Sequence, residues 1–181
     1  MISAMKLEAG SSVLCVVDLQ ERLLAAMPGS DAVVDRAGRL VRGAALLGVR
    51  SLLVEQYPQG LGVTPAAVAS ELPPALAKMT FSCCGCESFI DALPSDAESA
   101  VLCGLETHVC VAQTALDLLE RGLDVFVVVD AVRSRHAIDH ETALRRLESS
   151  GAILTTSEAV LFEWCQSAEH PQFQAVRRLV L

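Results

Sequence analysis

Cys110 is the residue of this sequence that is best placed to act as a nucleophile. Residues 100–103 form a short apolar run, as expected for a strand buried on both faces, and apolar residues recur at helical spacing from Val111 until Gly122 ends the pattern. Cys110 therefore lies where a predicted strand passes into a helix. The free N–H groups and the dipole at a helix N-terminus favour a reactive thiolate. Alternatively, Cys110 is one of several small buried hydrophobic residues.

Asp18 and Lys78 also occupy suggestive positions. Asp18 ends the apolar run 12–17, so it lies at the carboxyl end of a predicted strand, where parallel sheets bind their ligands. Its alternative role is to cap the following helix. Lys78 lies in an apolar run, and it is one of only two lysines in a chain that has 12 arginines. The alternative for Lys78 is an ordinary solvated side chain.

The composition describes a protein with a large buried core. Hydrophobic residues make up 52% of the 181 residues and aromatic residues 4%, with a mean hydropathy of +0.43, so the core consists mainly of Ala, Val and Leu. The formal net charge of −8 and the isoelectric point of about 4.9 exclude nucleic acids and anionic membranes as expected partners. No apolar run reaches the length of a membrane span.

Seven cysteines are distributed along the chain. Their odd number, with two of them inside predicted buried strands, favours reduced thiols in a cytoplasmic protein. Residues 1–10 contain no long apolar segment, so no secretory signal is expected. The cysteine-rich segment 83–86 lacks a second Cys or His pair at zinc spacing, and we expect no structural zinc there.

Predicted strands and helices alternate along the whole chain, which is typical of one doubly wound, three-layer α/β domain. The predicted strands cover residues 12–17, 49–55, 100–103, 123–129 and 152–155, with a further short run at 75–81. The predicted helices cover residues 19–26, 31–47, 64–72, 87–93, 111–119, 137–150, 158–165 (capped by Ser157) and 171–179. The glycine-rich segment 56–62 is either a loop that closes over a ligand or a plain surface turn.

Four parts of the sequence carry a resemblance to a known family. Segments 16–20, 103–111 and 130–131, together with Lys78, resemble the isochorismatase-like cysteine hydrolases, which include nicotinamidases and other amidohydrolases. Segments 56–62 and 154–158 look closer still to the isochorismatase-domain-containing subgroup. The resemblance covers nearly the whole chain. It implies one domain over residues 1–181, a six-stranded parallel sheet in the order 3-2-1-4-5-6, and a homo-oligomer.

The resemblance also implies a catalytic triad of Asp18, Lys78 and Cys110. In that arrangement Cys110 attacks an electrophilic carbon, Asp18 accepts the thiol proton and returns it to the leaving group, and Lys78 stabilises the thiolate and keeps Asp18 ionised. The backbone N–H groups of Glu106 and Cys110 would form an oxyanion hole, beside a cis peptide bond between Leu105 and Glu106. We expect substitutions of Asp18 or Lys78 to damage chemistry more than folding, because both lie at the sheet edge.

Several polar residues beside these strand ends are candidates for lining a substrate pocket. They are Gln20, Gln56, Tyr57, Thr107 and His108. Glu106 either alters this pocket with its side chain or points away to solvent. Nicotinamidases carry an Asp-x-His metal motif after the second strand, where this chain reads Glu55-Gln56-Tyr57 without a histidine. We therefore expect no metal and no other cofactor.

The sequence as a whole predicts a metal-independent cysteine hydrolase that cleaves a small amide-like C–N bond through a Cys110 thioester. We expect Cys110 to be the most reactive of the seven thiols below neutral pH. Two alternatives stay open: hydrolysis of an isochorismate-type vinyl ether, and a catalytically silent binding or scaffold protein that keeps the fold. The expected partner is a small-molecule substrate, and neither nucleic acid nor a membrane is expected.

Overall fold

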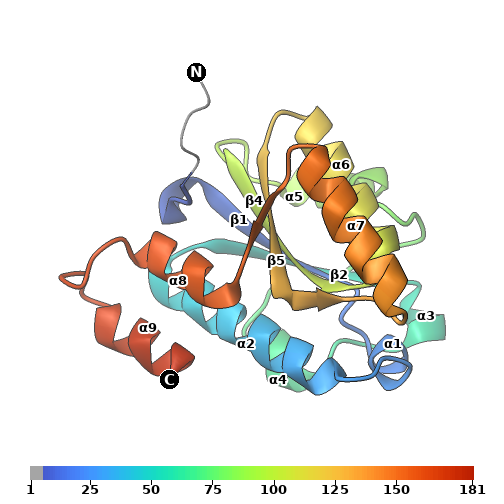
Figure 1. Cartoon of the computed structure of the whole chain (residues 1–181), viewed down its shortest axis with the longest axis horizontal. Coiled ribbons are helices and arrows are strands. Elements are labelled where there is room, and N and C mark those ends of the chain that lie inside the picture. Colours follow the sequence, from blue (N-terminus) through green and yellow to red (C-terminus); the bar gives the residue numbers. More distant parts are fainter. Residues whose placement is uncertain (1–5) are drawn as a thin grey trace.

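Six parallel strands form one sheet in the order β3-β2-β1-β4-β5-β6, which confirms the order implied by the resemblance (Figure 1). The computed structural model describes residues 6–181. The strands are β1 (Ser12–Val17), β2 (Arg50–Gln56), β3 (Leu76–Lys78), β4 (Ser99–Leu105), β5 (Asp124–Arg133) and β6 (Ile153–Thr155). β1 and β4 lie in the middle, and every residue in both strands is buried.

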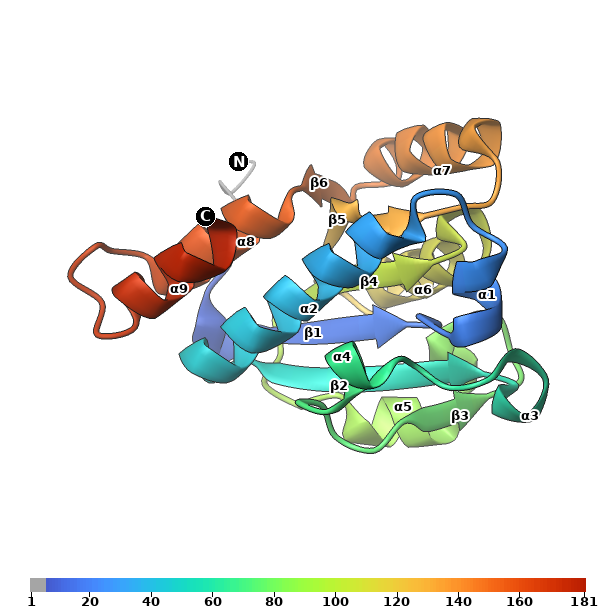
Figure 2. The ribbon, with the colours of Figure 1, turned by 90° about the horizontal axis from the view of Figure 1, so that it is seen from below.

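Helices cover both faces of the sheet. They are α1 (Glu21–Ala25), α2 (Ser30–Leu47), α3 (Pro58–Leu61), α4 (Ala66–Ala69), α5 (Glu87–Ala92), α6 (Ala112–Glu120), α7 (Ala137–Ser149), α8 (Ser157–Cys165) and α9 (Phe173–Val180). α2, α4, α8 and α9 pack on one face and α5, α6 and α7 on the other (Figures 1 and 2). Within residues 6–181, none of the helices has the length and apolar character that a membrane span requires.

Residues of β1 alternate between the two cores, as the two-residue period of a strand requires. Leu14 and Val16 pack against the α2 side, whereas Val13, Cys15 and Val17 pack against the α6 side. Because both faces are covered, the strand is apolar at nearly every position and not only at every second one. This is why a continuous apolar run identified the central strand in the sequence.

The carboxyl ends of the central strands meet at one edge of the sheet. Val17, the last residue of β1, pairs with Val54 in β2 and with Gly104 in β4. Gly104 has a φ of +135°, and a Cβ atom there would lie 1.8 Å from the carbonyl oxygen of Val17. Only glycine fits so close to the neighbouring strand. The close approach brings the end of β4 against the end of β1.

Several predicted element ends are wrong. β5 extends to Arg133, four residues beyond the predicted end, because its register shifts opposite Leu102 and Gly104 and its last residues then pair with Gly104 and Leu105. The segment after β2 contains the short helix α3, which the sequence did not predict. The helix before Gly122 begins earlier than predicted, with a π-helical turn over Thr107–Val111.

Two further expectations about local backbone and capping are wrong. The peptide bond between Leu105 and Glu106 is trans, like every other peptide bond in the described chain, and Glu106 makes the turn with a left-handed φ of 58°. Thr156, and not Ser157, caps α8 by accepting a hydrogen bond from the N–H of Ala159. Ser157 instead donates from its backbone and its hydroxyl to the carboxylate of Asp130, at 2.7 and 2.6 Å.

We expect Gly104→Ala to lower the free energy of unfolding by about 4 kcal/mol, because it adds an overlap with the β1 backbone to a strained φ. Urea denaturation measures the effect. Gly48→Ala is the matched control: Gly48 also has a positive φ (72°), but a Cβ there meets nothing within 4 Å. The control should lose only about 1–2 kcal/mol. Equal losses in the two variants would contradict the close approach.

Candidate active site

A buried ion pair joins Lys78, the last residue of β3, to Asp18, which follows β1. Lys78 Nζ lies 2.9 Å from Asp18 Oδ2, and both side chains are completely buried. Asp18 does not cap α1, because the N-cap position belongs to Gln20. Both alternatives raised by the sequence, a capping Asp and a solvated Lys, are therefore wrong. That substitutions here damage chemistry more than folding stays a prediction, although removing one member of a completely buried pair would leave an uncompensated charge.

The Lys78 ammonium uses all three of its N–H donors. It donates to Asp18 Oδ2 at 2.9 Å, to Gln56 Oε1 at 2.6 Å and to the carbonyl oxygen of Thr80 at 3.2 Å. Gln56 is the last residue of β2, so this ammonium links the ends of three adjacent strands. Since an ammonium has three donors, none is left for Cys110 in this arrangement. Lys78 therefore acts on the sulfur chiefly through its positive charge, which lowers the pKa of the Cys110 thiol.

Cys110 lies in the π-helical turn that follows β4, and it is 6% exposed. Its Sγ is 4.0 Å from Gln56 Oε1. Together with Asp18, it lines a cavity at the carboxyl edge of the sheet. π-helical turns inside helices are frequent at functional sites, where they aim a side chain that a regular helix would turn away. The structure thus brings all three predicted triad residues to one place.

Burial opposes the thiolate that a helix N-terminus would favour at Cys110. Burial, and next the carboxylate of Asp18, raise the pKa of the Cys110 thiol, and Lys78 offsets only part of this effect. Burial also raises the pKa of Asp18 above its ordinary value, although Lys78 acts in the opposite direction. Asp18 Oδ1 is buried and has no hydrogen-bond partner among the described residues. Burial and Asp18 therefore act against a thiolate at Cys110, and Asp18 Oδ1 stays available as an acceptor.

The raised pKa of Cys110 does not oppose proton transfer to Asp18. Loss of the thiol proton to solvent would leave two anions beside one ammonium in a buried site. Transfer of the same proton from Sγ to Asp18 keeps the net charge of the three groups unchanged. Burial is the largest cause of both raised pKa values, and two groups that interact in this way titrate as a coupled pair. Such a pair can form a thiolate at the moment when an electrophile arrives.

The cavity beside Cys110 has a volume of about 360 Å³, which suits a small molecule. Asp18, Gln56, Glu106, Cys110 and Arg135 supply its polar groups. Its apolar walls come from Leu23, Leu61, Phe81 and Val109. The arrangement combines a nucleophile and a base with a mainly apolar surround, so it can bind and attack a small organic substrate.

Of the five residues expected to line a substrate pocket, Gln56 lies on this cavity and the other four do not. Gln20 is completely buried, and its side chain holds both the backbone N–H and the carbonyl of Gln56, at 2.8 and 2.9 Å. It thus positions Gln56 from behind. Tyr57 is 47% exposed at the start of α3.

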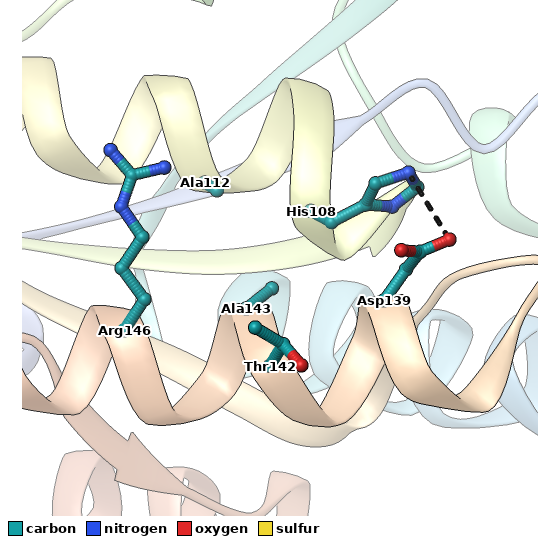
Figure 3. Close-up of a pocket in the computed structure, with 6 residues that line it drawn as sticks. All are labelled: His108, Ala112, Asp139, Thr142, Ala143 and Arg146. Atoms are coloured by element: carbon teal, nitrogen blue, oxygen red, sulfur yellow. Dashed lines mark ion pairs between the residues drawn. The ribbon is translucent and has the colours of Figure 1, made fainter.

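Thr107 and His108 both face α7. Thr107 Oγ1 lies 3.0 Å from His140 Nδ1. His108 lines a separate small pocket with Asp139 and Arg146, in which its Nε2 lies 3.9 Å from Asp139 Oδ2 (Figure 3). The two residues therefore connect the π-helical turn to α7 and not to a substrate beside Cys110.

Glu106 and Arg135 form a second charged pair at the cavity. Glu106 does not point to solvent, because its side chain is 8% exposed, and its Oε1 accepts from Arg135 Nε at 2.7 Å. Sequence reasoning missed Arg135 and the apolar wall residues. Arg135 follows the unpredicted extension of β5, and the sequence carries no local signal that this strand continues beyond residue 129.

The residues at the metal position of nicotinamidases do not fit a metal ion. Glu55 Oε1 accepts a hydrogen bond from the N–H of Thr64 at 2.7 Å, and the Gln56 side chain is engaged with Lys78 and the carbonyl of Met79. Over residues 6–181, no group of three or more His, Cys, Asp or Glu side chains is arranged to hold a metal. The cysteines of segment 83–86 are free thiols. That the activity is metal-independent stays a prediction.

Comparisons with known proteins give one consistent result. Residues 12–159 match the model of the isochorismatase domain. Isochorismatase domain-containing protein 2 of Bos taurus is 44% identical over 172 residues, which cover 94% of this chain and 83% of that protein. The Homo sapiens protein of the same name is 42% identical over the same shares. The solved structure of MAR1 ribonuclease from Caenorhabditis elegans is similar with a TM-score of 0.93 and 38% identity, covering 97% of this chain and 92% of that one.

We expect iodoacetamide at pH 7 to label Cys86 faster than Cys110. A hydrogen bond with Ser88 lowers the pKa of the partly exposed Cys86, whereas burial and Asp18 raise that of Cys110. Asp18→Asn should accelerate the labelling of Cys110, by about tenfold for each pKa unit that the thiol loses. Peptide mapping against pH measures both rates, and Cys86 is the internal reference. An unchanged Cys110 rate in a folded Asp18→Asn protein would contradict the contact between the two residues.

Proposed function

The chain belongs to the isochorismatase family and has its hydrolase fold, and from this premise we propose that it is a metal-independent cysteine hydrolase that cleaves a small amide-like C–N bond. One observation carries the proposal. The buried carboxylate of Asp18, held by Lys78 and with one oxygen free, lies on the same cavity as the thiol of Cys110. A nucleophile with a base beside it and a cavity in front of it are the parts that covalent catalysis requires.

The first step forms a thioester. Cys110 Sγ attacks the amide carbonyl carbon while its proton passes to Asp18, so a C–S bond forms and the carbonyl electron pair moves onto oxygen. The backbone N–H groups of Glu106 and Cys110 are the proposed donors to this oxyanion, and one such donor is typically worth about 3–4 kcal/mol. Asp18 then gives its proton to the nitrogen, and the C–N bond breaks with release of an amine or ammonia.

The second step restores the enzyme. Asp18, ionised again, takes a proton from a water molecule that attacks the thioester carbon. The C–S bond breaks, the product leaves as a carboxylic acid, and the proton returns to the Cys110 sulfur. Lys78 stays charged throughout, and its fixed position keeps the Asp18 carboxylate aimed at the sulfur. The raised pKa of Asp18 makes it a stronger base than an ordinary aspartate.

The assays described in the next paragraph also test three alternative functions. Hydrolysis of a vinyl ether of the isochorismate type is the first alternative, because a cavity of this size accommodates such a small molecule. RNA hydrolysis is the second alternative, because the similar Caenorhabditis elegans structure is named a ribonuclease. A net charge of −8, however, opposes binding to a polyanion. A silent scaffold has no need for a completely buried ion pair with an unpartnered carboxylate oxygen.

We expect a library of small amides to contain substrates, detected by released ammonia, with pyruvate release and RNA cleavage measured in parallel. Cys110→Ala should lower the rate by at least about 1,000-fold, because the covalent route is lost. Cys86→Ala, which removes the more accessible thiol, should leave the rate unchanged. Mass spectrometry of quenched wild-type enzyme should show an acyl group on Cys110. Full activity in folded Cys110→Ala would reject the mechanism.

We expect turnover to survive exhaustive treatment with EDTA, because the residues at the family's metal position are engaged in other hydrogen bonds. The rate of ammonia release before and after chelation measures this. The EDTA-treated enzyme is also assayed after addition of zinc or iron. Loss of activity that either metal restores would contradict the prediction.

We also propose a homo-oligomer. The YcaC gene product of Escherichia coli, described as an octameric hydrolase, has the same fold with a TM-score of 0.88 and 24% identity. Met79 and Phe81 follow β3 at the cavity edge and are 71% and 56% exposed, so association would bury apolar surface there. Light scattering at micromolar concentration is expected to give a multiple of 19.2 kDa. A stable monomer would refute this.

A further inference from the structure

A second cavity lies at the carboxyl end of β5, and its volume is about 260 Å³. Arg133 is the last residue of β5 and Ala137 is the first residue of α7, so the cavity lies where this strand passes into this helix. The residues that line it are Arg133, Ser134, Arg135, Ala137, His140 and Glu141. Arg135 also lines the cavity that contains Cys110. The two cavities therefore share one side chain at the edge of the sheet where parallel α/β proteins bind ligands.

The two arginines offer N–H groups that the protein itself does not use. Arg133 forms no ion pair with any of residues 6–181. Its guanidinium packs against the backbone before α2, since a Cβ atom at Gly29 would lie 3.6 Å from Arg133 Cζ. Arg135 donates to Glu106 Oε1 through Nε, which leaves the N–H groups on its two Nη atoms. Such N–H groups match the paired oxygens of a carboxylate or a phosphate.

His140 and Glu141 are the other titratable groups in the lining. His140 Nδ1 lies 3.0 Å from Thr107 Oγ1, so Nε2 is the remaining polar atom of this ring. Burial, and next the charge of Arg133, lower the pKa of His140, so the guanidinium acts on the cavity that the ring lines. Glu141 opposes an anion, but its side chain is exposed and solvent screens its charge. The cavity thus combines an unpaired cation with one screened carboxylate.

We propose that this cavity is a binding site for a small oxyanion, a carboxylate or phosphate group held by Arg133 and Arg135. The first turn of α7 adds to the attraction, because no side chain caps its N–H groups. Ser134 is not a ligand in this arrangement, since its Oγ is engaged with His108 Nδ1 at 3.0 Å. The oxyanion is either a free anion or the acidic end of the substrate. The site itself does not depend on the reaction proposed for Cys110, because none of these side chains takes part in a bond-making step.

Histidine NMR with inorganic phosphate or acetate tests the proposal without any turnover. The His140 signal is identified by its loss in His140→Gln. Either anion should raise the pKa of His140 in the wild-type protein, because a negative charge beside the ring offsets the effect of Arg133. The signal of His170, which does not line the cavity, is the internal reference and should not respond to the anions. A His140 signal that neither anion moves overturns the proposal.

Calorimetry with phosphate separates this cavity from general charge effects. Arg133→Gln should weaken the affinity for phosphate by about 10–100-fold, the usual range for a hydrogen bond between charged groups. Arg145→Gln is the matched control: it removes the same charge from an exposed position of α7 that does not line the cavity, and it should change the affinity by less than about twofold. Glu141→Gln should strengthen phosphate binding, because the opposing carboxylate is lost. A gain of affinity in this variant does not arise from damage to the fold.

Competition in Cys110→Ala identifies the source of the oxyanion. An amide that bears a carboxylate is compared with its methyl ester. If the acidic end of a substrate occupies the cavity, phosphate should displace the acid, and the ester should bind at least about tenfold more weakly. If the occupant is a free anion, acid and ester bind alike and phosphate binds together with either. Failure of every amide to bind rejects only the proposed hydrolysis, since the phosphate titration stands without it. Equal phosphate affinity in the wild-type protein and in folded Arg133→Gln overturns the oxyanion site, whatever the amides do.

Discussion

The buried ion pair between Lys78 and Asp18 is the constraint on which the rest of the site depends. Both charges are completely buried, so each needs hydrogen-bonding or ionic partners. The Asp18 carboxylate, the Gln56 side chain and the Thr80 carbonyl together accept hydrogen bonds from all three N–H groups of the Lys78 ammonium. These partners come from the ends of β1, β2 and β3 and from the segment after β3. The pair therefore fixes the sheet edge as well as the base. Because Asp18 has a left-handed φ of 53°, the same contact also holds a strained backbone in place.

The ion pair also influences the pKa of the Cys110 thiol. The ammonium donates to three oxygen atoms, while burial and the Asp18 carboxylate raise the pKa of the Cys110 thiol more than Lys78 lowers it. In the proposed mechanism, the thiolate forms by transfer of the thiol proton to Asp18. A site of this kind protects its sulfur from indiscriminate reagents while it stays ready for a bound electrophile. The cavity beside the sulfur is lined by apolar side chains and by the second charged pair, Glu106 with Arg135.

The sequence by itself determined the fold and the identity of the central residues. A strand buried on both faces leaves a clear local pattern, a continuous apolar run. Such runs end at Asp18 and at the turn before Cys110, so the sequence placed both residues at strand ends. Parallel strands necessarily share one carboxyl edge, so residues distant in the chain were expected to meet there. The order of the sheet and the family followed from the motifs around Asp18, Lys78 and Cys110, and the comparisons confirmed the family.

Only the tertiary structure decided the features that depend on packing between distant segments. The extension of β5, and with it the approach of Arg135 to Glu106, depends on a register shift against β4 that no local pattern encodes. The direction in which the Cys110 pKa shifts depends on how completely the fold removes water and on the charges around the sulfur. The sequence offered only the general effect of a helix N-terminus. Gln20 was expected on the pocket wall, yet it supports Gln56 from behind, since side-chain direction at the edge is set by neighbours in space. Local patterns fix the elements and their ends; burial, charge balance and side-chain direction are long-range properties, and they exist only once the chain has folded.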